Sequence, residues 1–383
     1  MLNLDCCRIR LDRFRKALDA QRVDVAILSH RRNIYYLTNH RREEDVPQFL
    51  VIHPDRRTTL ITDSPPESSA ADEVLTYESY SIDWPVSFAA VLAKASTVLE
   101  GALGRVHTPV ASLGLERERL NSIFFELITR RWPTAEIEDM TPVLGALRRR
   151  KDADEIRLIQ ACVKVIEAGY AAARKVIRPG INELEIFNAV HGEMVKAAGY
   201  QLQVTGDFAC GVRAIRGGGT PIDRRIEAGD LCILDIYPSF QGYHADLCRT
   251  FAASEPTDLQ LKAWEVSRDA LQLAKQRICP GVRASQVWTL IRDFIDQFEF
   301  VRESFWHHLG HGIGLDSQEP PWIIPGSDHV FEEGDVIALE PGCYAPALQG
   351  GVRLESNYIV RKNGLEDLSE FPYELAPLGA VSA

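Results

Sequence analysis

The chain has 383 residues, which is too long for one compact core, so we expect two domains. Hydrophobic residues make up 45% of the sequence and charged residues 25%, which is ordinary for a globular protein. The formal net charge of -11 disfavours nucleic acid as a partner, because the excess of acidic side chains repels phosphate groups.

The N-terminal residues, MLNLDCCRIRLDRF, contain charged residues where a signal peptide needs an apolar stretch. No apolar run in the sequence approaches the length that crosses a bilayer, so we expect a cytoplasmic protein without a membrane partner. The eight cysteines include no C-x-x-C pair, which disfavours a zinc finger.

The first part of the chain alternates helical and strand patterns. Apolar residues at helical spacing around Phe14 predict a helix, and the strand VDVAIL follows it. The segments FLVIH and TTLIT flank turn residues 54–57 and predict a β-hairpin. Helical patterns then cover 88–99 and 116–131. This alternation predicts a small α/β domain over residues 1–147.

Residues 148–383 form the second predicted domain, and the charged stretch RRRKDAD marks the boundary. A long amphipathic helix is predicted over 152–177, where Pro179-Gly180 stops it. Capping boxes at Asn182 and Thr257 start two further helices. Strand patterns dominate the rest, in LCILDIY, YHADLCRTFA, VIALE and VRLESNYIV.

Three of these strand patterns contain a carboxylate inside an apolar run: Asp235, Glu340 and Glu355. Burying an ionised carboxylate without a partner costs several kcal/mol. A single acid of this kind is more often part of a salt bridge than of a functional site. Three together require a common explanation.

A fourth acid, Asp246, is predicted to face Asp235 across a hairpin. We centre the turn between Phe240 and Gln241, and these two acids are equidistant from that centre. Cross-strand neighbours have Cβ atoms about 5 Å apart, and like charges at that distance destabilise a sheet. A metal ion between the two carboxylates would remove the repulsion.

His311 completes the candidate set, in the segment HHLGHGIGL, where glycines permit close backbone approach. Four carboxylates and one imidazole are an oxygen-rich ligand set that suits manganese, with cobalt, zinc or iron as alternatives. Four negative charges match two divalent ions about 3.5–4 Å apart. The alternative is a group of unrelated salt bridges with Arg249 and Arg353.

The order D-x10-D, GHGIGL, LEPG and GVRLE resembles the pita-bread metallopeptidases, among them Xaa-Pro aminopeptidases, prolidases, methionine aminopeptidases and creatinase. The N-terminal segments RLDRFRKAL, DVAIL and NIYYLT resemble the creatinase-like domain that precedes the catalytic domain of Xaa-Pro peptidases. The resemblance covers nearly the whole chain. It implies a creatinase-like α/β N-terminal domain followed by an α+β pita-bread catalytic domain.

The resemblance also implies residue roles. The family's five metal-ligand positions fall on Asp235, Asp246, His311, Glu340 and Glu355. A metal-activated water would attack a carbonyl carbon, with Glu340 as the proton acceptor. Thr250 matches a residue that orients a ligand carboxylate. A homodimer is implied as well, in which the N-terminal domain of one subunit borders the active site of the other.

Two positions depart from the family pattern. Gly218 and Gln318 stand where the peptidases have histidines that contact the substrate, whereas His307 matches a third such histidine. Glutamine can donate a hydrogen bond but cannot carry a proton, and glycine can do neither. His244 lies two residues from Asp246 and would share its face in a regular strand; the alternative is a hairpin residue near solvent.

Three functions therefore remain open. The first is a metal-dependent peptidase for short peptides such as Xaa-Pro. The second is a hydrolase of the same fold that cleaves a non-peptide C–N bond, as creatinase and ectoine hydrolase do, and the altered histidines favour it. The third is a non-catalytic binding module, which the intact ligand positions disfavour. The expected partner is a small peptide or small amide.

Overall fold

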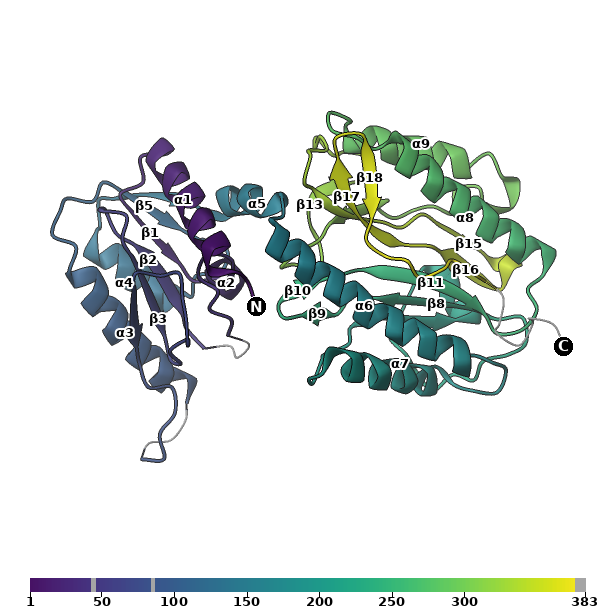
Figure 1. The fold of residues 1–383 in the computed structure, drawn as a ribbon, viewed down its shortest axis with the longest axis horizontal. Helices are drawn as coiled ribbons and strands as arrows, with labels where there is room; N and C mark the ends of the chain where they lie inside the picture. The colour runs from purple at the N-terminus through teal and green to yellow at the C-terminus, as the bar shows by residue number, and fades with distance from the viewer. Residues whose placement is uncertain (43–45, 84–86, 376–383) are drawn as a thin grey trace. The chain divides into compact units, whose positions relative to one another are not determined.

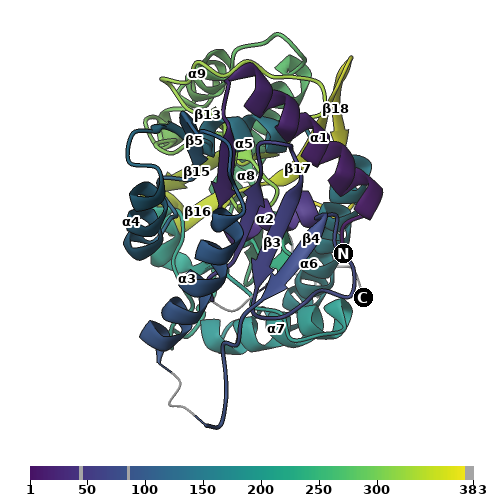
Figure 2. The same cartoon turned by 90° about the vertical axis from the view of Figure 1, so that its left-hand side faces the viewer.

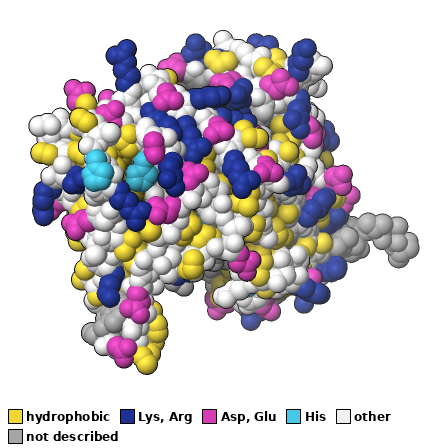
Figure 3. All heavy atoms as spheres, turned by 60° about the vertical axis from the view of Figure 1, so that its left-hand side comes forward, with side chains coloured by type: hydrophobic (Ala, Val, Ile, Leu, Met, Phe, Trp, Pro, Cys, Tyr) yellow, Lys and Arg dark blue, Asp and Glu magenta, His cyan; other side chains and the backbone are white. Residues whose placement is uncertain are grey.

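The computed structural model describes residues 1–42, 46–83 and 87–375. The chain divides into two compact units, Met1–Arg148 and Arg149–Ala383 (Figure 1). None of the described helices is long and apolar enough to cross a membrane. On the face shown in Figure 3, basic and acidic side chains are intermingled.

The N-terminal unit is built on a six-stranded mixed sheet in the order β4-β3-β2-β1-β5-β6. Its strands are β1 Val25–Leu28, β2 Phe49–Ile52, β3 Thr58–Thr62, β4 Glu73–Thr76, β5 Ser112–Leu115 and β6 Glu136–Asp139. Its helices are α1 Leu4–Ala20, α2 Arg31–Thr38, α3 Phe88–Gly104, α4 Ser122–Arg131 and α5 Thr141–Arg149. Helices α3 and α4 lie on one side of the sheet and α1 on the other (Figure 2). Phe49 of β2 and Phe124 of α4 pack edge to face in the core, with ring centroids 4.7 Å apart.

The predicted hairpin is confirmed, because β2 and β3 pair antiparallel with Phe49 opposite Ile61. The helix predicted from residue 116 begins later, at Ser122. Asn121 caps it by accepting a hydrogen bond from the Ile123 backbone N–H. Glu116 instead directly follows β5, and its buried carboxylate accepts hydrogen bonds from the backbone N–H groups of Ser29 and His30. Tertiary contacts thus override the helical pattern there.

The C-terminal unit repeats one arrangement twice, a pair of helices followed by an antiparallel sheet. The first half has α6 Ala153–Val176, α7 Glu183–Ala198, β7 Gly206–Cys210, β8 Leu231–Ile236 and β11 Leu247–Ala252. The second half has α8 Asp258–Arg277, α9 Ala284–Ile295, β12 Gly310–Gly312, β13 Glu319–Ile323, β14 Val336–Leu339, β17 Ser356–Arg361 and β18 Gly364–Asp367. Short strands complete the unit: β9 Ser239–Phe240, β10 Tyr243–His244, β15 Gly342–Ala345 and β16 Gly350–Arg353.

Three predicted helices of this unit are confirmed as α6, α7 and α8, and the capping boxes at Asn182 and Thr257 are formed. Helix α9 and strands β7, β9, β12, β13, β15 and β18 were not predicted. The sheets are ordered β11-β8-β7 and β13-β12-β14-β17-β18, and a bridge between Cys248 and Glu355 links them. Figure 1 shows the strands between α6 and α7 on one side and α8 and α9 on the other.

The predicted pairing of Asp235 with Asp246 is wrong. Gln241 (φ 48°) and Gly242 (φ 90°) form the centre of the turn, and Phe240 pairs with Tyr243. The turn therefore lies one residue later than predicted, which shifts the pairing by two and places Cys248 opposite Asp235. A two-residue turn with two positive φ angles matches the twist of a hairpin, and this geometry fixes the register.

Candidate metal centre

Five separate segments of the C-terminal unit deliver the candidate ligands. Asp235 lies near the end of β8, Asp246 directly precedes β11, and His311 lies in β12. Glu340 follows β14, and Glu355 lies between β16 and β17. All five residues are buried, with exposed fractions from 0% to 7%. The strand ends of both sheets thus converge on one buried acidic cluster.

Three overlapping groups of potential ligands form this cluster: two of them share Glu355, and the third contains His308, His311 and Glu340. Asp246, His311 and Glu355 each offer an atom within 4.8 Å of the others, and so do Asp235, Glu340 and Glu355. Because Glu355 belongs to both groups, the arrangement resembles two neighbouring cation positions that share one carboxylate. Such sharing is the usual arrangement of a dinuclear site.

Several buried polar atoms of the cluster form a donor set that a cation would satisfy. Oδ1 of Asp235, Oδ1 of Asp246 and both carboxylate oxygens of Glu355 are buried without a hydrogen-bond partner among the described residues, as is Nε2 of His311. Each such atom costs about 1–3 kcal/mol if it stays unsatisfied. The donor set of carboxylate oxygens and one imidazole nitrogen therefore fits divalent metal ions.

His311 is prepared to act as a ligand. Its Nδ1 lies 2.9 Å from the carbonyl oxygen of Gly312, so the ring proton is placed on Nδ1 and donates to that oxygen. The Nε2 lone pair is then free, and it lies 3.6 Å from carboxylate oxygens of both Asp246 and Glu340. Burial also lowers the pKa of His311, which keeps the ring neutral.

The backbone of Asp246 is clamped by one side chain. Asn357 donates from Nδ2 to the Asp246 carbonyl oxygen at 2.7 Å and accepts the Asp246 backbone N–H at 3.0 Å. Asn357 is fully buried in β17. This double contact fixes the backbone of Asp246, which lies just outside β11 and is not held by strand pairing.

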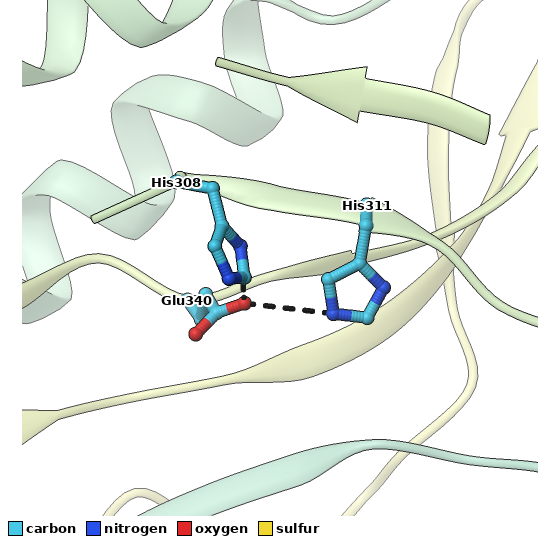
Figure 4. Close-up of side chains that lie close together, drawn as sticks. All are labelled: His308, His311 and Glu340. Carbon is cyan, nitrogen blue, oxygen red and sulfur yellow. Dashed lines mark ion pairs between the residues drawn. The ribbon is translucent and has the colours of Figure 1, made fainter. Parts of the chain in front are cut away.

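Glu340 is the acid that the surrounding positive groups keep ionised. Its Oε1 lies 3.1 Å from Nδ1 of His308. Burial favours the neutral acid, but the His308 hydrogen bond and the charges of His308, His307 and Arg353 outweigh burial and hold the pKa of Glu340 at about 2. Figure 4 shows the His308 and His311 rings directed at this one carboxylate.

Asp235 is held by an arginine rather than by a histidine. Nη2 of Arg353 donates to Oδ2 of Asp235 at 2.5 Å. Thr250 supports this contact indirectly: its hydroxyl donates to the Arg353 carbonyl oxygen and accepts the Arg353 backbone N–H. Thr250 was predicted to orient a ligand carboxylate, and its hydroxyl holds the backbone of β16 two residues before Glu355.

The other candidate residues lie in different surroundings. Nε2 of His307 lies 2.9 Å from the hydroxyl of Tyr344, and burial lowers the pKa of His307 to about 4. His244 is half-buried, and its Nδ1 lies 3.3 Å from the Tyr237 carbonyl oxygen. Gln318 is exposed, whereas its neighbour Glu319 is buried in an ion pair with Lys151.

Sequence reasoning missed His308 and Asn357, and it named Arg353 only as a salt-bridge partner in the alternative to a metal site. The adjacent histidines in HHLGH were a signal for His308, since neighbours in an irregular segment can both face a site. Nothing in the local sequence indicated that Asn357 would clamp Asp246 across 111 positions of the chain.

The metal-free protein should lose stability as the pH rises. Burial raises the pKa of Asp235 to about 6, and burial with neighbouring carboxylates raises those of Asp246 and Glu355 well above their ordinary values. An acid whose pKa is higher in the folded than in the unfolded protein stabilises the fold at pH values below its unfolded pKa. That stabilisation is lost as the pH rises through the folded pKa. Between about pH 4 and 6 the contribution of Asp235 to the free energy of unfolding should disappear. The contributions of Asp246 and Glu355 should disappear at higher pH.

Thermal unfolding of chelator-treated protein from pH 5 to 8 would measure this loss, and added manganese should suppress it. A melting temperature of the metal-free protein that rises across this range would contradict the predicted repulsion among the acids.

Comparison with known families identifies the fold. The sequence pattern of Metallopeptidase family M24 matches residues 157–362, and the Creatinase/Prolidase N-terminal domain matches residues 10–150. The chain belongs to Metallopeptidase family M24. It is a metallohydrolase with a creatinase-like N-terminal domain and a pita-bread C-terminal domain, as the sequence predicted, and its family uses divalent metal ions.

Named relatives match along the chain. An Xaa-Pro dipeptidase of Pyrococcus horikoshii is 25% identical over 97% of this chain and 100% of its own length. An Xaa-Pro dipeptidase of Pyrococcus furiosus is 31% identical over 63% of this chain and 68% of its own length. Among solved structures, an Xaa-Pro dipeptidase from Bacillus anthracis aligns with a TM-score of 0.82 at 26% identity, covering 97% of this chain and 99% of its own. The prolidase of Pyrococcus horikoshii aligns with a TM-score of 0.81 at 26% identity, covering 96% and 99%.

Proposed function

We propose that this metallopeptidase cleaves an amide bond of short peptides, with Xaa-Pro dipeptides as the first substrates to test. The observation that supports it most is the buried cluster in which two groups of ligand atoms share Glu355 and five of their atoms have no partner. The relatives named Xaa-Pro dipeptidase match both domains of the chain.

Two divalent ions, manganese by preference, would be held by Asp235, Asp246, His311, Glu340 and Glu355. When bound, they would polarise the scissile carbonyl and lower the pKa of a water molecule. Elemental analysis of protein purified without chelator should give up to two transition-metal ions per chain. Full activity of metal-free protein would contradict this assignment.

The side chains around the cluster have distinct proposed roles. Glu340 accepts the proton of the attacking water, and His308 keeps Glu340 ionised and oriented through the 3.1 Å contact. His307 is the nearest further histidine, and the Tyr344 hydroxyl restrains it. Gln318, an exposed residue directly before β13, is available only as a hydrogen-bond donor or acceptor to a substrate.

A hydrolase acting on a non-peptide C–N bond is the second candidate. The altered position 218 favours it, because a changed substrate-facing side chain is what a changed substrate requires. We therefore expect Xaa-Pro dipeptides to be cleaved slowly. Loss of a transition-state hydrogen-bond donor commonly costs about 10²–10³ in rate, and loss of general acid–base assistance about 10²–10⁴.

Steady-state kinetics on an Xaa-Pro panel, for the wild type, His307→Ala, His244→Ala and Gln318→His, decide between the two candidates. We expect slow cleavage by the wild type, a further loss in His307→Ala and a gain in Gln318→His. A wild-type kcat/KM above about 10⁵ M⁻¹s⁻¹, which lies within the ordinary enzyme range, would exclude the altered-substrate candidate.

We also propose a homodimer in which the N-terminal domain of one subunit borders the active site of its partner. The proposal rests on similarity to the family alone. Static light scattering at micromolar concentration should give twice the mass of one chain, and a monomer mass would refute it.

A further inference from the structure

Arg249 is a buried arginine on the side of β11 that faces away from the metal centre. Only 2% of this residue is exposed. Its neighbour Cys248 is paired with Asp235 across β11 and β8, and paired residues share a face of the sheet. Successive side chains of a strand point to opposite faces, so the Arg249 side chain leaves β11 on the face opposite to Asp235.

The Arg249 guanidinium donates hydrogen bonds to carbonyl oxygens of the main chain. Nη1 donates to the carbonyl oxygens of Cys248 at 2.9 Å and Glu355 at 2.5 Å. Nε donates to the carbonyl oxygen of Pro372 at 3.2 Å, and Nη2 donates to that of Phe371 at 2.8 Å. A buried charge persists only where its contacts compensate for the lost hydration, and these carbonyl oxygens supply that compensation.

Two of these contacts lie on the bridge that joins the two sheets beside the candidate ligands. The Glu355 backbone N–H donates to the Cys248 carbonyl oxygen at 3.0 Å, which forms the bridge between the sheets. Nη1 of Arg249 contacts the carbonyl oxygens of both bridge partners. Arg249 thus fixes the backbone of Glu355, the acid that two of the ligand groups share, relative to the strand pair that carries Asp235.

The C-terminal segment 369–375 holds the guanidinium from the other side. In addition to the two carbonyl contacts from this segment, the centre of the Tyr373 ring lies 4.1 Å from Cζ of Arg249, which is a cation–π contact. The segment is itself tied to α6, where the Glu167 carboxylate accepts the backbone N–H of Phe371 at 3.2 Å. The guanidinium is therefore enclosed between the Glu355 bridge and a C-terminal segment that α6 holds in place.

We propose that Arg249, held by the C-terminal segment, is a positioning residue for Glu355. By binding the Glu355 carbonyl oxygen, the guanidinium keeps the Glu355 carboxylate where two cation positions can share it. The inference rests on the proposed metal assignment, whose ligand geometry it extends. It gives residues 369–375, which lie beyond the matched family region 157–362, a part in metal binding.

Two variants remove the two sides of this contact. Arg249→Met removes the hydrogen-bond donors, and Tyr373→Ala removes the aromatic ring from the guanidinium while the arginine stays. Arg361→Met is the matched control for the loss of an arginine, because Arg361 is exposed and pairs with Glu366 on the surface. Ile295→Ala is the control for lost stability, because Ile295 is fully buried at the end of α9 and its truncation leaves a cavity.

Electron paramagnetic resonance measures manganese affinity, and visible absorption of cobalt-loaded protein reports the coordination geometry. We expect Arg249→Met to weaken binding of at least one manganese ion about tenfold or more and to change the cobalt spectrum, since residues that support metal ligands commonly contribute about 10–100-fold in affinity. Tyr373→Ala should weaken binding in the same direction.

Both controls should keep the wild-type affinity and cobalt spectrum, although Ile295→Ala should lower the melting temperature. Wild-type affinity and spectrum in Arg249→Met overturn the inference, and so does an equal loss of affinity in Ile295→Ala. If Arg249→Met does not fold, Tyr373→Ala decides the matter, and wild-type metal affinity in that variant overturns the inference.

Hydrogen exchange of metal-free protein, measured by mass spectrometry, tests the position of Glu355 without any ion. The peptide that contains Glu355 should exchange faster in Arg249→Met and Tyr373→Ala than in Ile295→Ala, because the bridge to Cys248 loses its support. Equal exchange rates in the three variants overturn the inference. Wild-type protein that binds no metal would instead refute the proposed function, and the exchange comparison would still decide whether Arg249 positions Glu355.

Discussion

Changing Asp246 to Asn should remove at least one bound metal ion per chain and abolish most activity. Asp246 belongs to the group that also contains His311 and Glu355, and its Oδ1 has no partner among the described residues. An amide oxygen is a weaker ligand for a hard cation than a carboxylate. The loss of kcat/KM should therefore exceed the roughly 10²–10³ that follows removal of one hydrogen-bond donor.

The same substitution should change stability in opposite directions with and without metal. Metal at 100 times its Kd stabilises the wild type by about 2.7 kcal/mol, which is about 5–10 °C in Tm for a unit of this size. Asp246→Asn should lose most of that gain. Without metal it should equal or exceed wild-type stability at pH 8, since one of the crowded carboxylates is gone.

Differential scanning calorimetry with and without chelator, together with metal analysis, measures both effects. Asp328→Asn serves as the control, because the Asp328 side chain is 97% exposed and pairs with Arg283. It should behave as wild type in both measurements. An Asp246→Asn protein that retains the full metal content would refute the ligand assignment.

Changing Glu340 to Gln should lower kcat by about 10²–10⁴, the usual contribution of general acid–base catalysis. Glutamine preserves the size of the side chain and can still contact His308, but it cannot accept a proton from water. Glu366→Gln in β18 is a matched control, because Glu366 is half exposed and pairs with Arg361 on the surface.

A second measurement reports the local electrostatic change directly. Burial alone would lower the pKa of His308, but the hydrogen bond and charge of Glu340 outweigh burial and raise it. The substitution should therefore lower the pKa of His308, which NMR titration of metal-free protein detects. A kcat within tenfold of wild type would rule out Glu340 as the proton acceptor.

Much of the fold followed from local patterns in the sequence. The capping boxes at Asn182 and Thr257 start helices where predicted, because the capping hydrogen bonds join residues only three positions apart. The strands LCILDIY and VIALE were visible as apolar runs, and the acids inside them marked a buried site. Helix α9 was missed although its apolar residues follow helical spacing.

The arrangement within the site depended on contacts that local patterns do not encode. One residue of difference in the turn at Gln241–Gly242 moved the partner of Asp235 from Asp246 to Cys248. The clamp of Asn357 on Asp246, the Arg353 contact with Asp235 and the ion pair between Lys151 and Glu319 each join residues more than 100 positions apart.

The sequence by itself determined the two-domain organisation, the family and the candidate ligand residues, because these depend on residue identity and order. Only the tertiary structure decided which atoms of those residues remain without partners, that His308 rather than His307 contacts Glu340, and that Asp207 fills the space beside Gly218. Those features arise where two sheets converge, and the packing of distant strands alone sets their geometry.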